Sequence, residues 1–161
     1  MIKVLFVCLG NICRSPLAEA LFKVKIQEEG FDKKFSADSA GTSDYHIGEL
    51  PDERTIACAK RHKIAIQHRG RQVNRRDFRD FDYIIAMDEQ NLKNLNLMKE
   101  KFGFPDKEIF LMRSFQDNPE SLSVPDPYYG GLDGFENVYQ ILDESIEGFL
   151  AQIKETHSQH A

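Results

Sequence analysis

The sequence has only three cysteines, no long apolar run and no excess of positive charge. Three cysteines are too few for a disulfide-stapled scaffold, so we expect a reducing compartment, the cytoplasm. No apolar stretch approaches the roughly 20 residues that span a bilayer, and the short run at 1–7 lacks the cleavage site of a signal peptide. A net charge of −5 argues against binding nucleic acid or an anionic membrane.

The length and the order of the expected elements predict a single domain over 1–161. About 41% of the 161 residues are hydrophobic, which is enough for one core and too little for two. Helical segments alternate with strand-like runs, which cover 3–8, 35–40, 82–87 and 109–112. This alternation predicts a three-layer α/β/α sandwich whose four-stranded parallel sheet has flavodoxin-like order. A long loop at 113–133 precedes the last helix, and we expect 157–161 to be a frayed tail.

The loop after the first strand carries the strongest motif, C-x5-R from Cys8 to Arg14, followed by Ser15 and Pro16. We expect Ser15 to cap the first helix and Pro16 to be its first residue. Backbone N–H groups of the loop and of the helix start can hold an anion, and Arg14 can place two donors on phosphate oxygens. The positive surroundings favour the thiolate of Cys8, and a hydrogen bond from Ser15 would favour it further. The loop therefore predicts a tetrahedral oxyanion held above a nucleophilic sulfur.

Two further residues support this interpretation of the loop. Gly10 permits backbone conformations closed to other residues, and Asn11 tolerates the left-handed region. The competing interpretation is that Cys8 is a small buried hydrophobe and the motif a chance match. The preceding strand and the capped helix favour function. A Walker A loop is excluded because Gly-Lys-Ser/Thr is missing, and a zinc finger because no second ligand pair has finger-like spacing.

A second motif, VPDPYYGG at 124–131, offers the partner that such a thiolate needs. An attack on a phosphoester requires an acid that protonates the leaving oxygen. Asp126 lies between two prolines, which restrict its backbone, and parallel topology brings its loop to the sheet edge of Cys8. Tyr128 and Tyr129 offer aromatic faces to a flat substrate. Taken alone, the segment predicts an ordinary turn. Together with the loop at Cys8, it predicts that Asp126 is a general acid.

Together these motifs resemble those of the low-molecular-weight protein tyrosine phosphatases. The V-C-x-G-N-I-C-R-S-P signature matches 7–16 and D-P-Y-Y matches 126–129, while DSAGTS at 38–43 and MDEQN at 87–91 fit family patterns. The resemblance extends from residue 2 to about 153. Other cysteine phosphatases carry C-x5-R late in the chain and after the acid loop, which is the reverse of the order here.

The resemblance implies hydrolysis of phosphotyrosine and aryl phosphate monoesters through a cysteinyl-phosphate, with no metal or organic cofactor. Cys8 would be the nucleophile, Arg14 and the loop amides would bind phosphate, and Asp126 would be the general acid and then the base. Residues that shape or complete the phosphate loop would be Leu9, Gly10, Asn11, Ile12, Cys13, Ser15, Ser39 and His68. Residues that line the aryl pocket would be Leu9, Ile12, Tyr45, Tyr128 and Tyr129.

The implied partners are tyrosine-phosphorylated proteins and a cognate tyrosine kinase system, and we expect a monomer. An arsenate reductase shares the fold and the loop, but its relay needs two further cysteines and none follows Cys58. A catalytically silent phosphoprotein- or anion-binding module is expected where Cys8, Arg14 or Asp126 is replaced, and all three are present. A thiol oxidoreductase is disfavoured because Cys8 and Cys13 lack C-x-x-C spacing.

Three smaller signals remain. Cys13 either forms a reversible disulfide with Cys8, as the family resemblance allows, or packs as a buried thiol under the loop. Cys58 is expected in the core. The five arginines of 68–80 are expected to form a solvated face rather than a docking surface for acidic residues near a phosphotyrosine.

Overall fold

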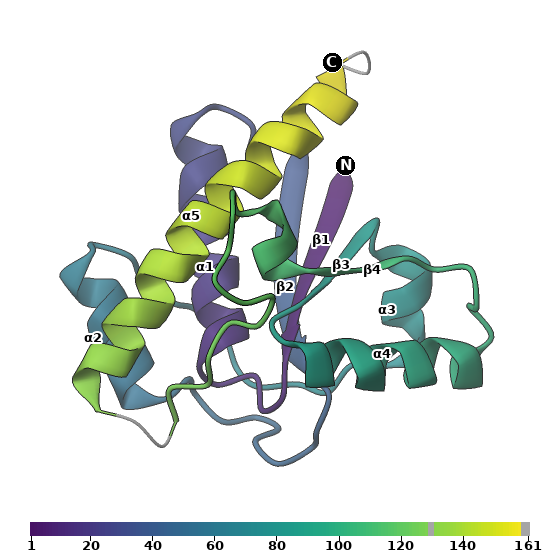
Figure 1. Ribbon diagram of the computed structural model, residues 1–161, viewed down its shortest axis with the longest axis horizontal. Helices are drawn as coiled ribbons and strands as arrows, with labels where there is room; N and C mark the ends of the chain where they lie inside the picture. Colours follow the sequence, from purple (N-terminus) through teal and green to yellow (C-terminus); the bar gives the residue numbers. More distant parts are fainter. Residues whose placement is uncertain (129–130, 159–161) are drawn as a thin grey trace.

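Four parallel strands form one sheet in the order β2-β1-β3-β4 (Figure 1). The computed structural model describes residues 1–128 and 131–158. The strands are β1 (Ile2–Cys8), β2 (Phe35–Gly41), β3 (Tyr83–Ala86) and β4 (Ile109–Leu111). β2 and β3 pair in parallel with opposite edges of β1. The chain therefore adds β2 on one side of β1 and then β3 and β4 on the other side. The predicted flavodoxin-like order is confirmed, and a ligand is expected at the carboxyl ends of β1 and β3.

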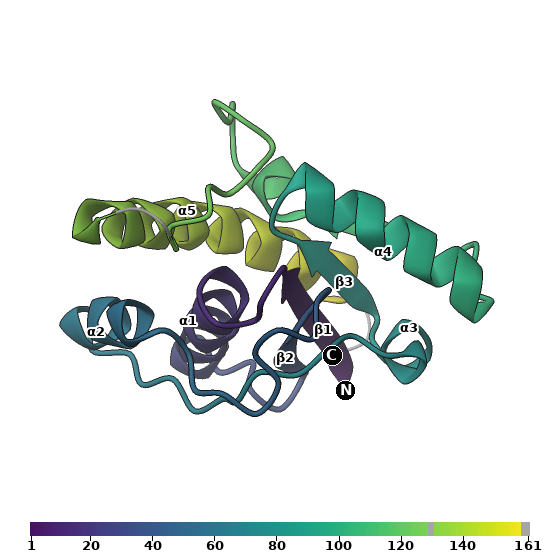
Figure 2. The same cartoon turned by 90° about the horizontal axis from the view of Figure 1, so that it is seen from below.

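Helices cover both faces of this sheet, which confirms the three-layer prediction (Figure 2). One side carries α1 (Arg14–Glu28), α2 (Glu53–Arg61) and α5 (Leu132–Thr156), and the other carries α3 (Arg75–Asp80) and α4 (Glu89–Phe102). The side chains of β1 alternate between the two cores. Phe6 packs on the α1–α5 side, whereas Leu5 and Val7 pack on the α3–α4 side. A strand that is buried on both faces needs a continuous apolar run, as its sequence has.

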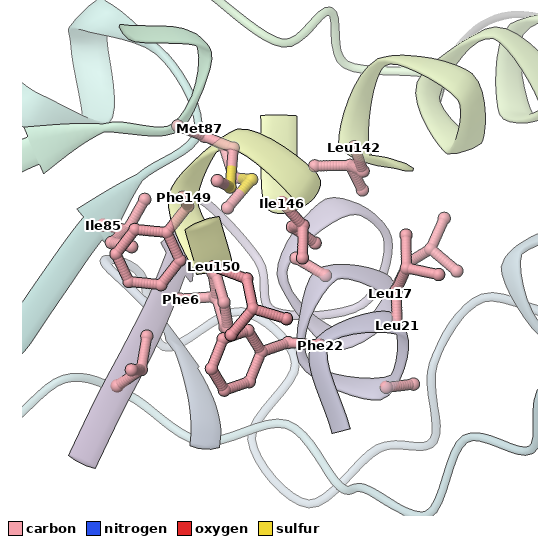
Figure 3. Packing of buried hydrophobic residues seen from close by; sticks show 14 of the residues in the cluster. Phe6, Leu17, Leu21, Phe22, Ile85, Met87, Leu142, Ile146, Phe149 and Leu150 are labelled. Atoms are coloured by element: carbon pink, nitrogen blue, oxygen red, sulfur yellow. The ribbon is translucent and has the colours of Figure 1, made fainter. Parts of the chain in front are cut away.

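Aromatic rings fill the core between β1, α1 and α5 (Figure 3). The ring centroids of Phe6 and Phe22 lie 5.7 Å apart, and those of Phe22 and Phe149 lie 5.9 Å apart. All three side chains are fully buried. Such ring pairs add about 0.5–1.5 kcal/mol each to the area they bury. They fix α1 against β1, and thereby fix the two ends of the loop that joins them.

The first helix starts earlier than predicted. Cys13 is the N-cap of α1 and Arg14 its first residue, so Ser15 does not cap the helix and Pro16 is not its first residue. The Ser15 hydroxyl instead lies 3.0 Å from Cys8 Sγ. Pro16 is still tolerated because the first turn of a helix leaves its backbone N–H groups unpaired.

Other boundaries also differ from the prediction. A 3₁₀ turn, Met112–Phe115, occupies the start of the expected 113–133 loop. The short helix α3 lies within the arginine-rich stretch, where the guanidinium of Arg71 pairs with Asp77 at 3.0 Å instead of facing solvent alone. Of the tail expected at 157–161, His157 places its Nε2 2.8 Å from the hydroxyl of Tyr83, and 159–161 lie outside the described residues.

Candidate active site

The loop from Cys8 to Arg14, which the sequence predicts to bind phosphate and which we call the phosphate loop, lies at the carboxyl end of β1, where Cys8 is the last residue of the strand. The Cys8 side chain is buried, and its Sγ accepts a hydrogen bond from the backbone N–H of Asn11 at 3.3 Å. Asn11 has a φ of 58°, the left-handed conformation that its residue type tolerates. This one residue turns the loop back towards the sulfur.

The side chain of Asn11 is the centre of a buried network beneath the loop. Its Nδ2 donates to Ser15 Oγ at 2.8 Å and to Ser39 Oγ at 3.0 Å. Its Oδ1 accepts from the backbone N–H of Arg71 at 3.0 Å and lies 2.7 Å from Nε2 of His68. The structure therefore joins four of the eight residues expected to shape or complete the loop, namely Asn11, Ser15, Ser39 and His68.

The contacts of Ser15 leave its hydroxyl hydrogen available for a bond to Cys8. Ser15 Oγ already accepts from Asn11 Nδ2 at 2.8 Å, so its own hydrogen is free to point at Cys8 Sγ, 3.0 Å away. The carbonyl of Ala40, at 3.5 Å, is a longer alternative acceptor. Ser15 is thus placed to donate to the sulfur.

Glu19 is a buried member of the network that the sequence analysis missed. Its Oε1 accepts from Ser39 Oγ at 2.7 Å and lies 3.2 Å from Nδ1 of His68. Burial lowers the pKa of His68, although the negative charges of Glu19 and Asp38 oppose that change. In the sequence, Glu19 is a carboxylate on the otherwise apolar inward face of the first helix. This was the signal that could have identified it as a member of the network.

Arg14 is almost completely buried, and its position is set by residues from other elements. Its Nη1 donates to Asp88 Oδ2 at 2.7 Å and to the carbonyl of Val124 at 2.9 Å. Burial works against its charge, but the negative charges of Cys8 and Asp88, with Asp126, outweigh it and raise the pKa of the guanidinium. Asp88 was missed from the sequence, although it directly follows β3 within the MDEQN match.

The acid loop reaches the same place. Oδ2 of Asp126 lies 3.7 Å from Nη2 of Arg14, as expected from parallel topology. Oδ1 of Asp126 accepts from the backbone N–H of Tyr128 at 3.0 Å. Arg54 of α2 then holds the loop, because its Nη2 donates to the carbonyl of Tyr128 at 2.8 Å and its guanidinium lies 5.6 Å from that ring. Arg54 was not expected from the sequence.

A pocket of about 170 Å³ opens above the loop. The residues around it are Cys8, Leu9, Gly10, Ile12, Cys13, Arg14, Tyr45, His46, Asp126 and Tyr128. Ser15, Ser39 and His68 do not line it and lie in the network behind the loop. Tyr129, expected in the aryl pocket, lies outside the described residues. His46, the neighbour of Tyr45, also lines the pocket, and its ring centroid lies 6.4 Å from that of Tyr128.

The two other cysteines are free and buried, as is Cys8. Burial raises the pKa of the Cys13 thiol to about 12, so this thiol is protonated at neutral pH. Cys58 is fully buried, as predicted. Of the three thiols, Cys8 is the one that accepts a backbone N–H within the loop and has a serine hydroxyl aimed at it.

Comparison with known proteins agrees with this geometry. Residues 3–159 match the family model described as low molecular weight phosphotyrosine protein phosphatase. A phosphatase of that name from Pongo abelii is 46% identical over 147 residues, covering 91% of this chain and 92% of the relative. A crystal structure of a protein tyrosine phosphatase from Entamoeba histolytica is 41% identical with a TM-score of 0.89, covering 97% of this chain and 99% of that one.

A second solved structure is described as a Drosophila arginine phosphatase. It is 38% identical with a TM-score of 0.90, and the match covers 95% of this chain and 98% of that chain. Both structures therefore share the fold along nearly their whole length. With the family model spanning the phosphate loop and the acid loop together, the chain belongs to the low molecular weight phosphotyrosine protein phosphatase family.

Proposed function

We propose that Cys8 is the nucleophile of a two-step phosphatase reaction on phosphotyrosine. In the first step the Cys8 thiolate attacks phosphorus, an S–P bond forms and the P–O bond to the phenol breaks. The observation that carries this assignment is the position of the sulfur, which accepts from the Asn11 N–H at 3.3 Å and faces the Ser15 hydroxyl at 3.0 Å. Both contacts hold the sulfur among the residues that line the pocket.

Arg14 and the loop amides hold the oxygens of the transferring phosphoryl group in this proposal. The guanidinium is fixed by Asp88 and Val124 through Nη1, at 2.7 and 2.9 Å, which leaves Nη2 on the side of Asp126. A donor fixed before the reaction costs no reorganisation when charge develops on the oxygens. The charge on Arg14 also offsets that of the thiolate.

Asp126 moves the protons in both steps. As an acid it protonates the leaving phenolate oxygen; as a carboxylate it then takes a proton from water, which attacks phosphorus and breaks the S–P bond. The products are a phenol, inorganic phosphate and the regenerated thiolate. The half-exposed carboxylate suits this role, because its Oδ1 is fixed by the Tyr128 N–H at 3.0 Å while water still reaches the group.

The pocket wall favours an aryl phosphate over a phosphorylated guanidinium. Tyr128 and Tyr45 present aromatic faces, whereas Leu9 and Ile12 present apolar side chains. A phosphotyrosine ring needs only such contacts. A phosphoarginine group brings additional N–H donors, and the side chains of Leu9 and Ile12 offer these no acceptor, which costs free energy. Phosphoarginine is the informative competitor because a neighbour in structure is described as an arginine phosphatase.

The substrates are phosphoproteins, and we propose that a cognate tyrosine kinase supplies them in the cytoplasm, where the protein acts as a monomer. Three free cysteines agree with a reducing compartment. Within the described residues, no helix combines the length and the apolar character needed to cross a membrane. Gel filtration tests the monomer.

The test compares wild type, Cys8→Ser and Asp126→Ala on para-nitrophenyl phosphate at mildly acidic pH, with and without EDTA. We expect EDTA-insensitive turnover that vanishes in Cys8→Ser and falls by about 10²–10⁴ in Asp126→Ala. A phosphotyrosine peptide and the same peptide carrying phosphoarginine separate the two substrate classes. No turnover by freshly reduced wild type would contradict the proposal. Faster release of phosphate from phosphoarginine would contradict its aryl selectivity.

A further inference from the structure

A second set of reactive side chains lies between α2 and α5, outside the phosphate pocket. Cys58 and His62 are four residues apart at the end of α2, so they face the same way. Glu136 of α5 completes the set, and the ligand atoms of all three lie within 4.8 Å of one another. Nε2 of His62 lies 2.7 Å from Glu136 Oε1, and Cys58 Sγ lies 3.5 Å from Glu136 Oε2. The hydrolytic mechanism uses none of them.

We propose that Cys58, His62 and Glu136 form a binding site for a zinc-type divalent ion. Zinc takes sulfur, imidazole nitrogen and carboxylate oxygen together, at about 2.0–2.3 Å, and three protein ligands leave one position for water. Ligand atoms around a tetrahedral ion are then about 3.5 Å apart. Cys58 Sγ contacts Oε2 of Glu136 at 3.5 Å, and Nε2 of His62 contacts the other oxygen, Oε1, at 2.7 Å. Because one ligand atom from each residue lies within 4.8 Å of the others, small side-chain movements bring the three to this separation.

The surroundings hold two of the ligands in the required orientation. The imidazole of His62 stacks on the ring of Tyr139, with centroids 3.6 Å apart and planes 9° from parallel. The Nε2 of Gln140 donates to Oε1 of Glu136 at 3.2 Å, which restrains the carboxylate. Contacts of this kind around metal ligands fix their direction and strengthen binding.

Two of the three ligands can be reached from solvent. The surface hollow beside them is lined by Arg61, His62, Asp133 and Glu136. The side chains of His62 and Glu136 are partly exposed, at 27% and 38%, so water can complete the coordination. Cys58 lies behind them and is fully buried. The site is therefore open on its histidine and carboxylate side and closed on its sulfur side.

Binding must overcome two opposing features. Nη2 of Arg61 lies 3.6 Å from Oε2 of Glu136 and would have to move aside. Burial, together with the charge of Glu136, raises the pKa of the Cys58 thiol to about 11. The ion must therefore displace the thiol proton to solvent as the metal–sulfur bond forms. Ions that prefer sulfur and nitrogen can do this, whereas Mg²⁺ and Ca²⁺, which prefer oxygen, cannot.

The experiment uses the full-length chain with Cys8→Ser and Cys13→Ser, so that Cys58 is the one thiol left of the three. Titration with Co²⁺ is followed by the thiolate-to-cobalt absorption band, and Zn²⁺ then displaces the cobalt. We expect one equivalent of Co²⁺ to bind with this band, and Mg²⁺ to produce no displacement. Adding Cys58→Ser should abolish the band, and adding His62→Ala or Glu136→Gln should weaken binding about tenfold or more.

The matched control is His46→Ala in the same background. His46 lies 2.9 Å from the carboxylate of Glu49, so it has the same histidine–carboxylate contact without a sulfur. This variant should bind Co²⁺ as tightly as its parent. Circular dichroism verifies folding, and Cys58→Ala replaces Cys58→Ser should the serine variant unfold. A thermal scan should show that Zn²⁺ raises the melting temperature of the parent and not that of Glu136→Gln.

Two results would overturn the proposal. One is the absence of a thiolate band at one equivalent of Co²⁺ in the folded parent. The other is a thiolate band that persists in both His62→Ala and Glu136→Gln with an unchanged affinity for Co²⁺. Cys58 would then bind the metal without these two residues. Both results leave the phosphatase assignment untouched, because the hydrolytic residues and the EDTA-insensitive assay are separate from this site.

Discussion

Arg14 and Asp88 form a partly buried ion pair in which Nη1 lies 2.7 Å from Oδ2, although the residues are 74 positions apart. The other oxygen of the same carboxylate, Oδ1, accepts from the backbone N–H of Asn91 at 2.6 Å and caps α4. One carboxylate therefore both orients the guanidinium of the phosphate loop and starts a helix on the other face of the sheet.

These two roles can be separated by substitution. Asp88→Asn keeps an oxygen that caps α4, because asparagine and aspartate are similar N-caps, but it removes the charge that faces Arg14. We expect kcat/KM to fall about tenfold or more, since a hydrogen bond to a charged group contributes about 1.5–3 kcal/mol. Asp88→Ala should lose a similar activity and also about 1 kcal/mol of stability. Unfolding in urea and steady-state kinetics measure the two effects, and unchanged kcat/KM in Asp88→Asn would contradict the orienting role.

Asn11 also combines two roles, one in its backbone and one in its side chain. Asn11→Gly retains the left-handed turn at φ 58° but loses the hydrogen bonds to Ser15 and Ser39. Asn11→Ala loses those bonds and also strains the backbone, by about 1–2 kcal/mol. We expect both variants to lose at least tenfold in kcat/KM, and alanine to melt at the lower temperature. A glycine variant with wild-type kcat/KM would show that the side-chain network does not support catalysis.

The buried imidazole of His68 predicts a specific pH dependence of stability. Its pKa is lowered from 6.5 by burial, against the charges of Glu19 and Asp38 and with the help of Arg71 and Lys23. Below pH 6.5 the unfolded chain therefore binds more protons at this residue than the folded one, so acidification costs stability down to the lowered pKa. His68→Gln lacks this contribution.

The free energy of unfolding of wild type and His68→Gln, measured in urea from about pH 8 to about pH 5, tests the sign. We expect the difference between the two proteins to shrink as the pH falls below 6.5. All other titrating groups are shared, so they cancel to first order. If the difference instead grows on acidification, the charges of Glu19 and Asp38 raise the pKa of His68 by more than burial lowers it.

Gly70 sets the position of one wall of the pocket. It exchanges backbone hydrogen bonds with the 46–49 turn, at 2.8 Å to Gly48 and 2.8 Å to Glu49. A Cβ at residue 70 would lie 2.3 Å from the carbonyl oxygen of His46, which is backbone and cannot rotate away. Gly70→Ala must therefore displace the turn that carries His46 into the pocket.

We expect Gly70→Ala to raise KM for phosphotyrosine peptides several-fold, with less effect on the smaller para-nitrophenyl phosphate. Gly134→Ala is the matched control, because a Cβ there meets Pro127 at an ordinary 3.8 Å. It should leave both KM values near those of wild type. Equal KM changes for both substrates in Gly70→Ala would contradict a role of this wall in peptide binding.

The sequence by itself predicted the sheet, the turn of the chain from Cys8 to Arg14, and the position of Asp126 beside it. β1 could be predicted because burial on both faces requires a continuous apolar run, and the loop because its residues are adjacent along the chain. Asp126 could be placed near Cys8 without coordinates, since parallel strands bring their carboxyl ends to one edge. Local sequence also made Ser15 look like a helix cap, because its type favours that position.

Only the tertiary structure decided which partners these residues have. Ser15 does not cap the helix, because the helix already begins at Arg14, and its hydroxyl contacts Cys8 and Asn11 instead. Glu19 and Asp88 belong to the site because helix packing and strand register bring them to Ser39 and Arg14. Which groups a side chain contacts depends on residues far away in the sequence, and a local sequence pattern does not contain this information. The chemistry of the side chain follows from those contacts.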